Sequence, residues 1–96
     1  MKWRFFITPK VQAALRTFPP ETKRYIREAF GEIRSDPWIG KPLRDELEGF
    51  HSFRAKRFRI VYQIRRHEIT IVVIAVGPRE TIYEELATEW LSKQAT

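Results

Sequence analysis

The sequence predicts an α+β fold: a small antiparallel β-sheet of about four strands, an N-terminal helical hairpin packed on the sheet, and a C-terminal helix. Three observations predict it. Two amphipathic segments joined by a diproline follow a short aromatic strand, three strand-like segments follow one another over residues 50–76, and another amphipathic segment begins near residue 82. The 96 residues are enough for one modest core, so we expect a single domain over residues 1–96.

The first half of the chain is expected to form a strand and two helices. Residues 3–7 (WRFFI) read as the strand, and Thr8-Pro9 begins a helix, because the hydroxyl can cap free amides and proline lacks an N–H that the first turn would leave unpaired. The second helix ends near Asp36-Pro37, since a residue before proline avoids the helical region. The apolar side chains expected on the inner faces are Val11, Leu15 and Phe18, then Tyr25, Ile26, Ala29, Phe30 and Ile33.

The second half is expected to form a strand meander. Residues 38–48 read as a loop with a helical turn near 43–47. Three strands are then expected, at Phe50–Ala55, Phe58–Arg65 and Glu68–Val76. Arg66-His67 is expected to form the tight turn between the second and the third strand. The third strand is apolar on both faces, which indicates an interior strand. In the second strand, successive side chains point to opposite faces of the sheet. One face carries Phe58, Ile60, Tyr62 and Ile64, and the other carries Arg59, Val61, Gln63 and Arg65.

The last helix is expected to begin at Ile82. Thr81 and Glu84 fit a capping box, in which the two side chains satisfy backbone amides at the start of a helix. An apolar stripe follows, and the polar face of this helix is acidic.

Positive charge is concentrated in one part of the chain. The net charge is +6, and the stretch from Phe50 to Arg66 carries six arginines and lysines and no carboxylate within an alternating apolar pattern. One face of these strands can therefore lie on a core while the other displays fixed positive charge. This pattern favours a phosphate backbone, and RNA in particular, over a small-molecule substrate.

Other classes of protein are disfavoured. There is no cysteine, which excludes a disulfide framework and thiolate metal sites and suits the cytoplasm. No apolar run is long enough for a membrane span, so we expect no membrane partner. His51 and His67 show no metal-ligand spacing with the carboxylates, and nothing indicates a small-molecule cofactor.

Two segments carry a resemblance to a known family. The stretch KPLRDELEGFHSFRAKRFRIVYQI, followed by VIAVGPRETIYEEL, resembles the RelE/ParE superfamily of toxins from type II toxin–antitoxin pairs. Arg79 and Tyr83 in the second segment look more like the RelE branch, whose members cleave messenger RNA, usually on the ribosome. The resemblance implies a metal-independent endoribonuclease with catalytic residues at Arg54, Arg59, Arg79 and Tyr83.

The chemistry expected of such an enzyme fits these side chains. Without a metal, the 2′-hydroxyl of the RNA attacks the adjacent phosphorus, and the protein aligns the groups, compensates the charge of the phosphorane and moves protons. Arginine suits the charge compensation because its forked donors match phosphate oxygens. The residues expected to bind RNA around this centre are His51, Ser52, Arg57 and Arg65.

The general base is left open by the sequence. In the pattern of the family a lysine lies two residues before the position of Arg54, where this chain has Ser52. Lys56 and His51 are the local alternatives, and Lys56 is slightly preferred because it shares the strand parity of Ser52 and Arg54, whereas His51 lies on the opposite face. The remaining alternative is that no strong base is present, so that cleavage is slow or depends on ribosomal groups.

The resemblance also implies partners and competing functions. The expected partners are a cognate antitoxin, acidic in its toxin-binding part, together with messenger RNA and the ribosome. Two alternatives are a ParE-like inhibitor of DNA gyrase and a catalytically degenerate toxin that only binds its antitoxin.

Overall fold

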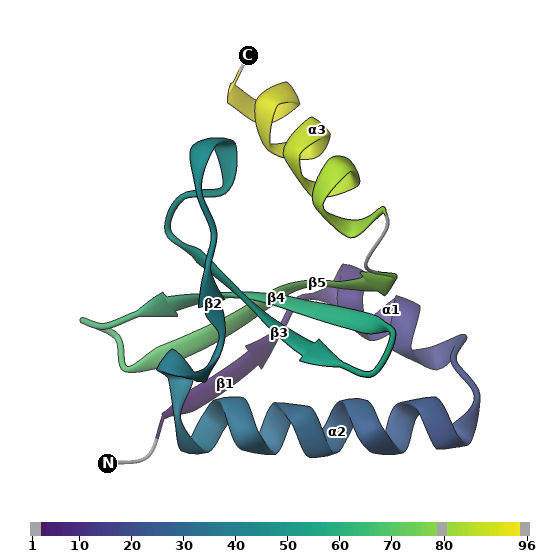
Figure 1. Ribbon diagram of the computed structural model, residues 1–96. Coiled ribbons are helices and arrows are strands. Elements are labelled where there is room, and N and C mark those ends of the chain that lie inside the picture. The colour runs from purple at the N-terminus through teal and green to yellow at the C-terminus, as the bar shows by residue number, and fades with distance from the viewer. Residues whose placement is uncertain (1–2, 79–80, 95–96) are drawn as a thin grey trace.

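The computed structural model describes residues 3–78 and 81–94, which form a β-sheet with helices on both of its faces (Figure 1). Helices α1 and α2 lie against one face, and α3 stands over the other. The elements in chain order are β1 (Arg4–Ile7), α1 (Pro9–Arg16), α2 (Pro20–Ser35), the 3₁₀ helix η1 (Pro37–Ile39), β2 (Lys41–Pro42), the 3₁₀ helix η2 (Asp45–Leu47), β3 (Phe50–Ala55), β4 (Phe58–Arg65), β5 (Thr70–Pro78) and α3 (Ile82–Gln94).

The sheet confirms the predicted α+β class and differs from the prediction in two details. Its strands lie in the order β1-β5-β4-β3-β2, so the described residues contain five strands rather than about four. The additional strand, β2, lies in the segment predicted as a loop and pairs with β3 through Lys41 and Ser52. The sheet is also mixed, because β1 runs parallel to β5 while the other pairs are antiparallel. The predicted interior place of β5 is confirmed.

The predicted bounds of β5 are wrong by two residues at each end. The strand begins at Thr70, which pairs with Arg65, and ends at Pro78, which pairs with Phe58. The preceding turn is therefore longer than the predicted Arg66-His67 pair, and it closes with a hydrogen bond from the Ile69 amide to the Arg66 carbonyl of 3.1 Å. The pairing with β4, which is set by tertiary structure, decides these bounds.

A β-bulge changes which side chains of β5 face each layer. Val61 pairs with Ala75, but the next residue of β4, Tyr62, pairs with Val73, so that Ile74 is the additional residue on β5. A bulge of this kind interrupts the alternation of side chains along a strand. Beyond it, Ala75 lies on the α3 face.

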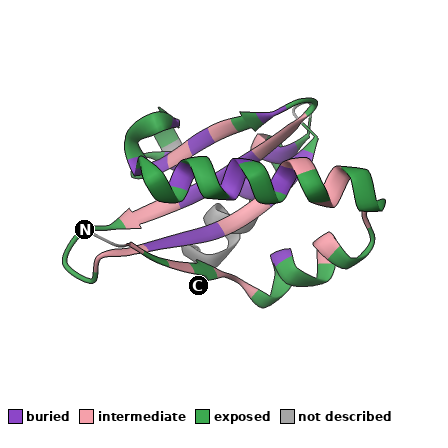
Figure 2. Ribbon diagram, turned by 90° about the horizontal axis from the view of Figure 1, so that it is seen from below, coloured by how far each residue is buried: buried purple, intermediate pink, exposed green. Residues whose placement is uncertain are grey.

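The main core lies between the sheet and the helical hairpin. Figure 2 shows that α2 turns its buried residues toward the sheet, while its outer surface is exposed. Helix α1 begins as predicted, with the Thr8 hydroxyl accepting a hydrogen bond from the Val11 amide. The buried side chains of this core are Val11, Ile26, Ala29, Phe30, Ile33, Ala55, Ile60, Tyr62, Ile71, Val73 and Val76. Within the described part of the chain, no helix is long and apolar enough to cross a membrane.

Tyr62 connects this core to the segment before β2. Its side chain is 0% exposed, its hydroxyl donates to the Pro37 carbonyl at 2.7 Å, and it accepts a hydrogen bond from the Gly40 amide at 3.0 Å. A Cβ atom at position 40 would collide with the Tyr62 hydroxyl, so the close approach of the backbone requires glycine. Tyr62 thus holds η1 and the start of β2 against the sheet.

A second, smaller core lies under α3. It contains Leu47, Phe50, Val61, Ile82 and Leu86, with Tyr83 and Ala87 partly buried at its border. Ile82 is the first residue of α3, as predicted, and its side chain packs over Gly77, where an added Cβ would lie 2.9 Å from the Ile82 Cδ1 atom. The glycine at the end of β5 therefore allows the start of α3 to lie close to the sheet.

Candidate functional site

Two arginines and a glycine form a row across three strands on the α3 face. Arg54 on β3 pairs with Arg59 on β4, and Arg59 pairs with Gly77 on β5. Alternation aims both arginine side chains at the same face of the sheet. Because Gly77 has no side chain, the row carries two guanidinium groups, and the Ile82 side chain of α3 packs over the third position.

Neither arginine is neutralised by a carboxylate among the side chains that can be described. Among the side chains that the structure describes, no aspartate or glutamate forms an ion pair with Arg54 or Arg59. The Nε atom of Arg59 is buried and has no hydrogen-bond partner among the same residues. Arg54 is exposed, and its Nε donates to the Lys56 carbonyl at 3.1 Å. Buried polar groups are normally paired, so an unpaired guanidinium N–H next to a second arginine is suited to receive an anionic oxygen.

The neighbouring row brings Ser52 and Tyr83 together. Ser52 pairs with Val61, which pairs with Ala75, so this row lies two residues along β3 from the arginine row, or about 7 Å. The hydroxyl groups of Ser52 and Tyr83 lie 2.6 Å apart and form a hydrogen bond between β3 and α3. Ser52 is 2% exposed, while Tyr83 is half-buried.

The structure therefore places Ser52, Arg54, Arg59 and Tyr83 on one face of the sheet. The predicted residue Arg79 lies outside the described residues, directly after Pro78 at the end of β5 in the chain. Aligned donors and fixed positive charge of this kind can hold a phosphodiester and stabilise negative charge that develops on it.

Lys56 is not brought together with this group. It occupies the predicted turn between β3 and β4. Its backbone φ is 56°, a value that residues other than glycine rarely adopt. Its Nζ atom lies 4.9 Å from the centre of the Tyr25 ring, so the ammonium is on the α2 side of the sheet. Shared strand parity does not extend into the turn, because the backbone reverses there. Arg57, the other residue of the turn, is exposed.

His51 lies on the opposite face from Ser52 and Arg54, as the parity of β3 predicts. Its ring stacks on Tyr62, with the ring centres 5.7 Å apart and an angle of 23° between the planes. Burial lowers the pKa of His51 from its ordinary value of 6.5. Its Nδ1 atom is buried and has no hydrogen-bond partner within the described residues. His51 also borders an open groove that includes Lys41 and Arg44, away from the arginine row.

Arg65 is remote from the arginine row. It lies at the far end of β4, six residues from Arg59, which corresponds to about 20 Å along a strand. Its guanidinium lies 3.7 Å from the Glu68 carboxylate, and its Nε donates to the Gln63 side chain at 3.1 Å. A carboxylate already neutralises part of its charge, so this position is less suited to an anion than Arg54 or Arg59.

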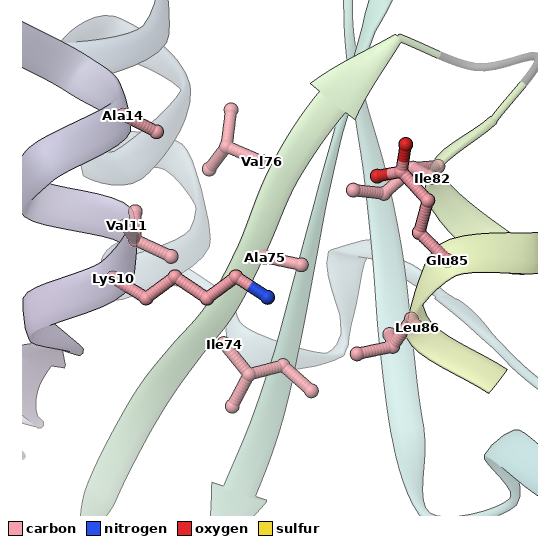
Figure 3. Close-up of a pocket in the computed structure, with 9 residues that line it drawn as sticks. All are labelled: Lys10, Val11, Ala14, Ile74, Ala75, Val76, Ile82, Glu85 and Leu86. Carbon is pink, nitrogen blue, oxygen red and sulfur yellow. The ribbon is translucent and has the colours of Figure 1, made fainter. Parts of the chain in front are cut away.

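A small cavity between α1, β5 and α3 has a different character. Figure 3 shows that Val11, Ile74, Ile82 and Leu86 point toward it, and its volume is ≈ 80 Å³. Lys10 and Glu85 lie at its border. Its mainly aliphatic lining does not fit a phosphate group. No group of three or more histidines, aspartates or glutamates in the described part of the chain is placed to hold a metal ion.

Two features of the site were missed in the sequence analysis. Gly77 was part of the resemblance but was not identified as the position beside Arg59 on which Ile82 packs, although a glycine within a strand is a known signal of a close approach. Ser52 was expected to bind RNA, and its hydrogen bond with Tyr83 joins residues 31 positions apart. No local sequence signal reports such a contact.

Comparison with known proteins places these features in a family. The family model of the ParE toxin of type II toxin–antitoxin systems, parDE, matches residues 6–83. Toxin RelG of Mycobacterium tuberculosis is 34% identical to this chain over 85 residues, which span 86% of the chain and 98% of the relative. Toxin RelE of the same organism is 45% identical over 59 residues, 60% of this chain and 61% of the relative.

Solved structures have the same fold. A chain in the crystal structure of the toxin–antitoxin complex RelBE2 from M. tuberculosis is 32% identical, with a TM-score of 0.75 over 82% of this chain and 100% of that one. E. coli toxin RelE in the free state also has a TM-score of 0.75, over 97% of this chain and 98% of that one, at 19% identity. Because the identity with the E. coli protein is low, this similarity shows a shared fold alone.

Proposed function

The chain belongs to the RelE/ParE superfamily of toxins from type II toxin–antitoxin systems, and we propose that it is an endoribonuclease that cleaves messenger RNA on the ribosome without a metal ion. The observation that supports this proposal most directly is the arginine row. Arg54 and Arg59 are cross-strand partners with no described carboxylate paired to either, and the buried Nε of Arg59 is unpaired. Such a pair matches a phosphodiester, whose charge increases during cleavage.

The proposed reaction uses the RNA as its own nucleophile. The 2′-hydroxyl loses its proton and attacks the adjacent phosphorus, and the bond to the 5′-oxygen breaks. The 5′-oxygen takes up a proton from water to become a hydroxyl, and a 2′,3′-cyclic phosphate is formed. Arg54 and Arg59 hold the non-bridging oxygens and stabilise the phosphorane, where the charge is greatest. Tyr83, on the same face, contacts the phosphate or stacks on a neighbouring base. Arg79 completes the proposed set by resemblance.

Lys56 is left out of this set because its ammonium lies over Tyr25 on the other side of the sheet. His51 is left out for the same reason, since it stacks on Tyr62 on that side. The proposal therefore contains no strong general base from this chain, and the proton of the 2′-hydroxyl passes to water or to a ribosomal group. Arg57 is proposed to extend the contacts with the RNA backbone from the hairpin turn.

The proposed partners follow from charge and from the relatives. The chain of 32% identity was solved in a toxin–antitoxin complex, and we propose that this chain also binds a cognate antitoxin. Because the net charge is +6, the toxin-binding part of that antitoxin is expected to be acidic. The other proposed partners, messenger RNA and the ribosome, place the protein in the cytoplasm.

The experiment is to map the 5′ ends of messenger RNA after expression of the chain, and to repeat the cleavage with purified protein on naked RNA, with and without EDTA, and on ribosome-bound RNA at a fixed magnesium concentration. Cuts within codons, unaffected by EDTA and lost on replacement of Arg54 and Arg59 by alanine, are expected. The metal test is made on naked RNA because EDTA dissociates the ribosome, and on ribosome-bound RNA the arginine variants are compared with the wild type.

The family match also supports a second candidate, inhibition of DNA gyrase, because the matching model describes a ParE toxin. Intact RNA together with gyrase-linked DNA breaks would establish this candidate and overturn the nuclease. A chain that neither cuts RNA nor stops growth, but still binds its antitoxin, would be a degenerate toxin.

A further inference from the structure

The hydrogen bond between Ser52 and Tyr83 joins two hydroxyl groups in different surroundings. The oxygens lie 2.6 Å apart, Ser52 is 2% exposed, and Tyr83 is half-buried at the border of the α3 core. One cross-strand neighbour of Ser52 is Val61, which is 0% exposed, and the other is Lys41 on β2. The serine side of this hydrogen bond is therefore buried, whereas Tyr83 keeps part of its surface exposed.

This difference decides which hydroxyl donates. Within the described residues, Tyr83 is the one hydrogen-bond partner of the Ser52 hydroxyl. If Tyr83 donated, the proton of Ser52 would be buried without an acceptor, which is an unfavourable state for a hydroxyl group. If Ser52 donates, its proton is satisfied, and the proton of Tyr83 is turned toward the side that is open to solvent. The second arrangement is the stable one.

We infer that Ser52 is a positioning residue that donates to the Tyr83 oxygen and thereby directs the Tyr83 proton toward the face that carries Arg54 and Arg59. This inference rests on the proposed function. Directed in this way, the Tyr83 hydroxyl donates a hydrogen bond to a non-bridging phosphate oxygen, beside the two guanidinium groups. Because the direction of the Tyr83 O–H bond is fixed before the RNA binds, the hydroxyl does not have to reorient as charge develops on the phosphorane. No covalent bond or proton transfer involves Ser52.

The position of Ser52 fits this role. It lies two residues from Arg54 on the same face of β3, so the hydroxyl pair and the arginine row are separated by about 7 Å. The buried apolar side chains of the α3 core, which include its neighbour Val61, lower the local dielectric constant and so strengthen the hydrogen bond.

The test is a double-mutant cycle in the full chain with Ser52→Ala, Tyr83→Phe and both together, measured by steady-state cleavage of an RNA that the wild type cuts. Ser52→Ala is expected to lower kcat by about tenfold to a hundredfold, with KM changed less than about twofold, because the geometry of one donor is lost. Tyr83→Phe is expected to lower kcat by at least the same factor. When Ser52→Ala is added to Tyr83→Phe, kcat should not fall further, since Ser52 acts through the Tyr83 hydroxyl.

Two controls separate positioning from folding. Thr17→Ala removes a side-chain hydrogen bond of 2.7 Å at the end of α1, which packs on the opposite face of the sheet from the arginine row, and should leave kcat unchanged. Ser52→Thr keeps a hydroxyl and should recover most of the lost kcat, whereas Ser52→Ala should not. The denaturant midpoint of unfolding of each variant is measured at the assay temperature. Any loss of activity that comes from unfolded protein can then be subtracted.

The outcomes distinguish this inference from the proposed function. A wild-type chain that cuts no RNA overturns the proposed function and the role of Ser52 with it. A wild type that cuts, with Ser52→Ala equally active, overturns the role of Ser52 alone. Losses that multiply in the double variant overturn it too, because independent effects mean that Ser52 does not act through Tyr83.

Discussion

Arg54 on β3 and Arg59 on β4 lie directly opposite one another in the sheet. Like charges at directly opposed positions destabilise a sheet, and the buried, unpaired Nε of Arg59 adds a second unfavourable contribution. No hydrogen bond or ion pair to a described side chain holds the two guanidinium groups in this arrangement. An anion bound between the two guanidinium groups removes both costs, which connects an unfavourable feature of the fold to the proposed RNA site.

The first prediction concerns stability and activity together. Arg59→Met removes the like-charge pair and the unpaired Nε while keeping a long side chain, and it is expected to raise the free energy of unfolding by about 0.5–1 kcal/mol. The same change should reduce RNA cleavage by about a hundredfold or more, because one donor to the phosphorane is lost. Urea unfolding and a single-turnover cleavage assay measure the two effects.

A matched control for this variant is Arg24→Met, since Arg24 is exposed on α2, on the far side of the sheet. Its effect on stability should stay within about 0.5 kcal/mol, and cleavage should be unchanged. If Arg59→Met instead lowers stability and leaves cleavage intact, Arg59 is a structural residue and the proposed site is wrong.

The second prediction concerns the hydroxyl of Tyr62. Tyr62→Phe keeps the ring but leaves the buried Pro37 carbonyl and Gly40 amide without their shared partner, at 2.7 and 3.0 Å in the native protein. The expected loss in the free energy of unfolding is about 2–4 kcal/mol, because each buried group left unsatisfied costs about 1–3 kcal/mol. Denaturant unfolding of Tyr62→Phe beside Tyr25→Phe provides the measurement.

Tyr25 is a suitable control because it packs on Phe58 and its hydroxyl has no hydrogen bond within the described residues. Its replacement by phenylalanine should change stability by less than about 0.5 kcal/mol. Equal losses in the two variants would mean that the Tyr62 hydrogen bonds add nothing to the ring packing.

The third prediction concerns the dependence of stability on pH. Burial holds the pKa of His51 below its ordinary value of 6.5, so the unfolded chain binds this proton more readily than the folded chain. The contribution of neutral His51 to the free energy of unfolding is therefore complete above pH 6.5. It is lost as the pH falls through the lower pKa that His51 has in the folded protein. His51→Phe, which keeps an aromatic ring on Tyr62, should remove this part of the pH dependence.

The measurement is the difference in the free energy of unfolding between wild type and variant, followed from about pH 7 to pH 5, where the carboxylates contribute least. His67→Gln is the control, since His67 is exposed in the turn after β4. A wild-type curve that His51→Phe does not flatten would show that burial of His51 has no thermodynamic effect.

The sequence was informative wherever a local rule decides the structure. Periodicity and caps placed β3, β4 and the start of α3, and strand parity put Ser52 and Arg54 on one face of β3. β2 was missed because Lys41-Pro42 is too short to show alternation. Its pairing with β3 depends on Tyr62, which holds the preceding segment from a distant strand.

The site was less predictable than the fold because it depends on pairings between distant residues. Ser52 and Tyr83 meet only when α3 packs on the sheet, and Gly77 lies beside Arg59 only in the register that the bulge of β5 permits. Parity also failed for Lys56, since a turn reverses the direction of the backbone and releases the side chain from the alternation of the strand.

The last prediction tests the two basic residues of that turn against each other. Lys56→Gln keeps the stem of the side chain and removes the ammonium that lies over Tyr25, so it should cost about 0.5 kcal/mol of stability. Cleavage should fall by less than about threefold, because loss of a general base costs about a hundredfold or more. Arg57→Gln, at the exposed neighbouring position, should instead raise KM and weaken the dependence of KM on salt, since one contact with the RNA backbone is lost. A fall in kcat of a hundredfold in Lys56→Gln alone would make Lys56 the missing base, and would require its side chain to leave Tyr25 when RNA binds.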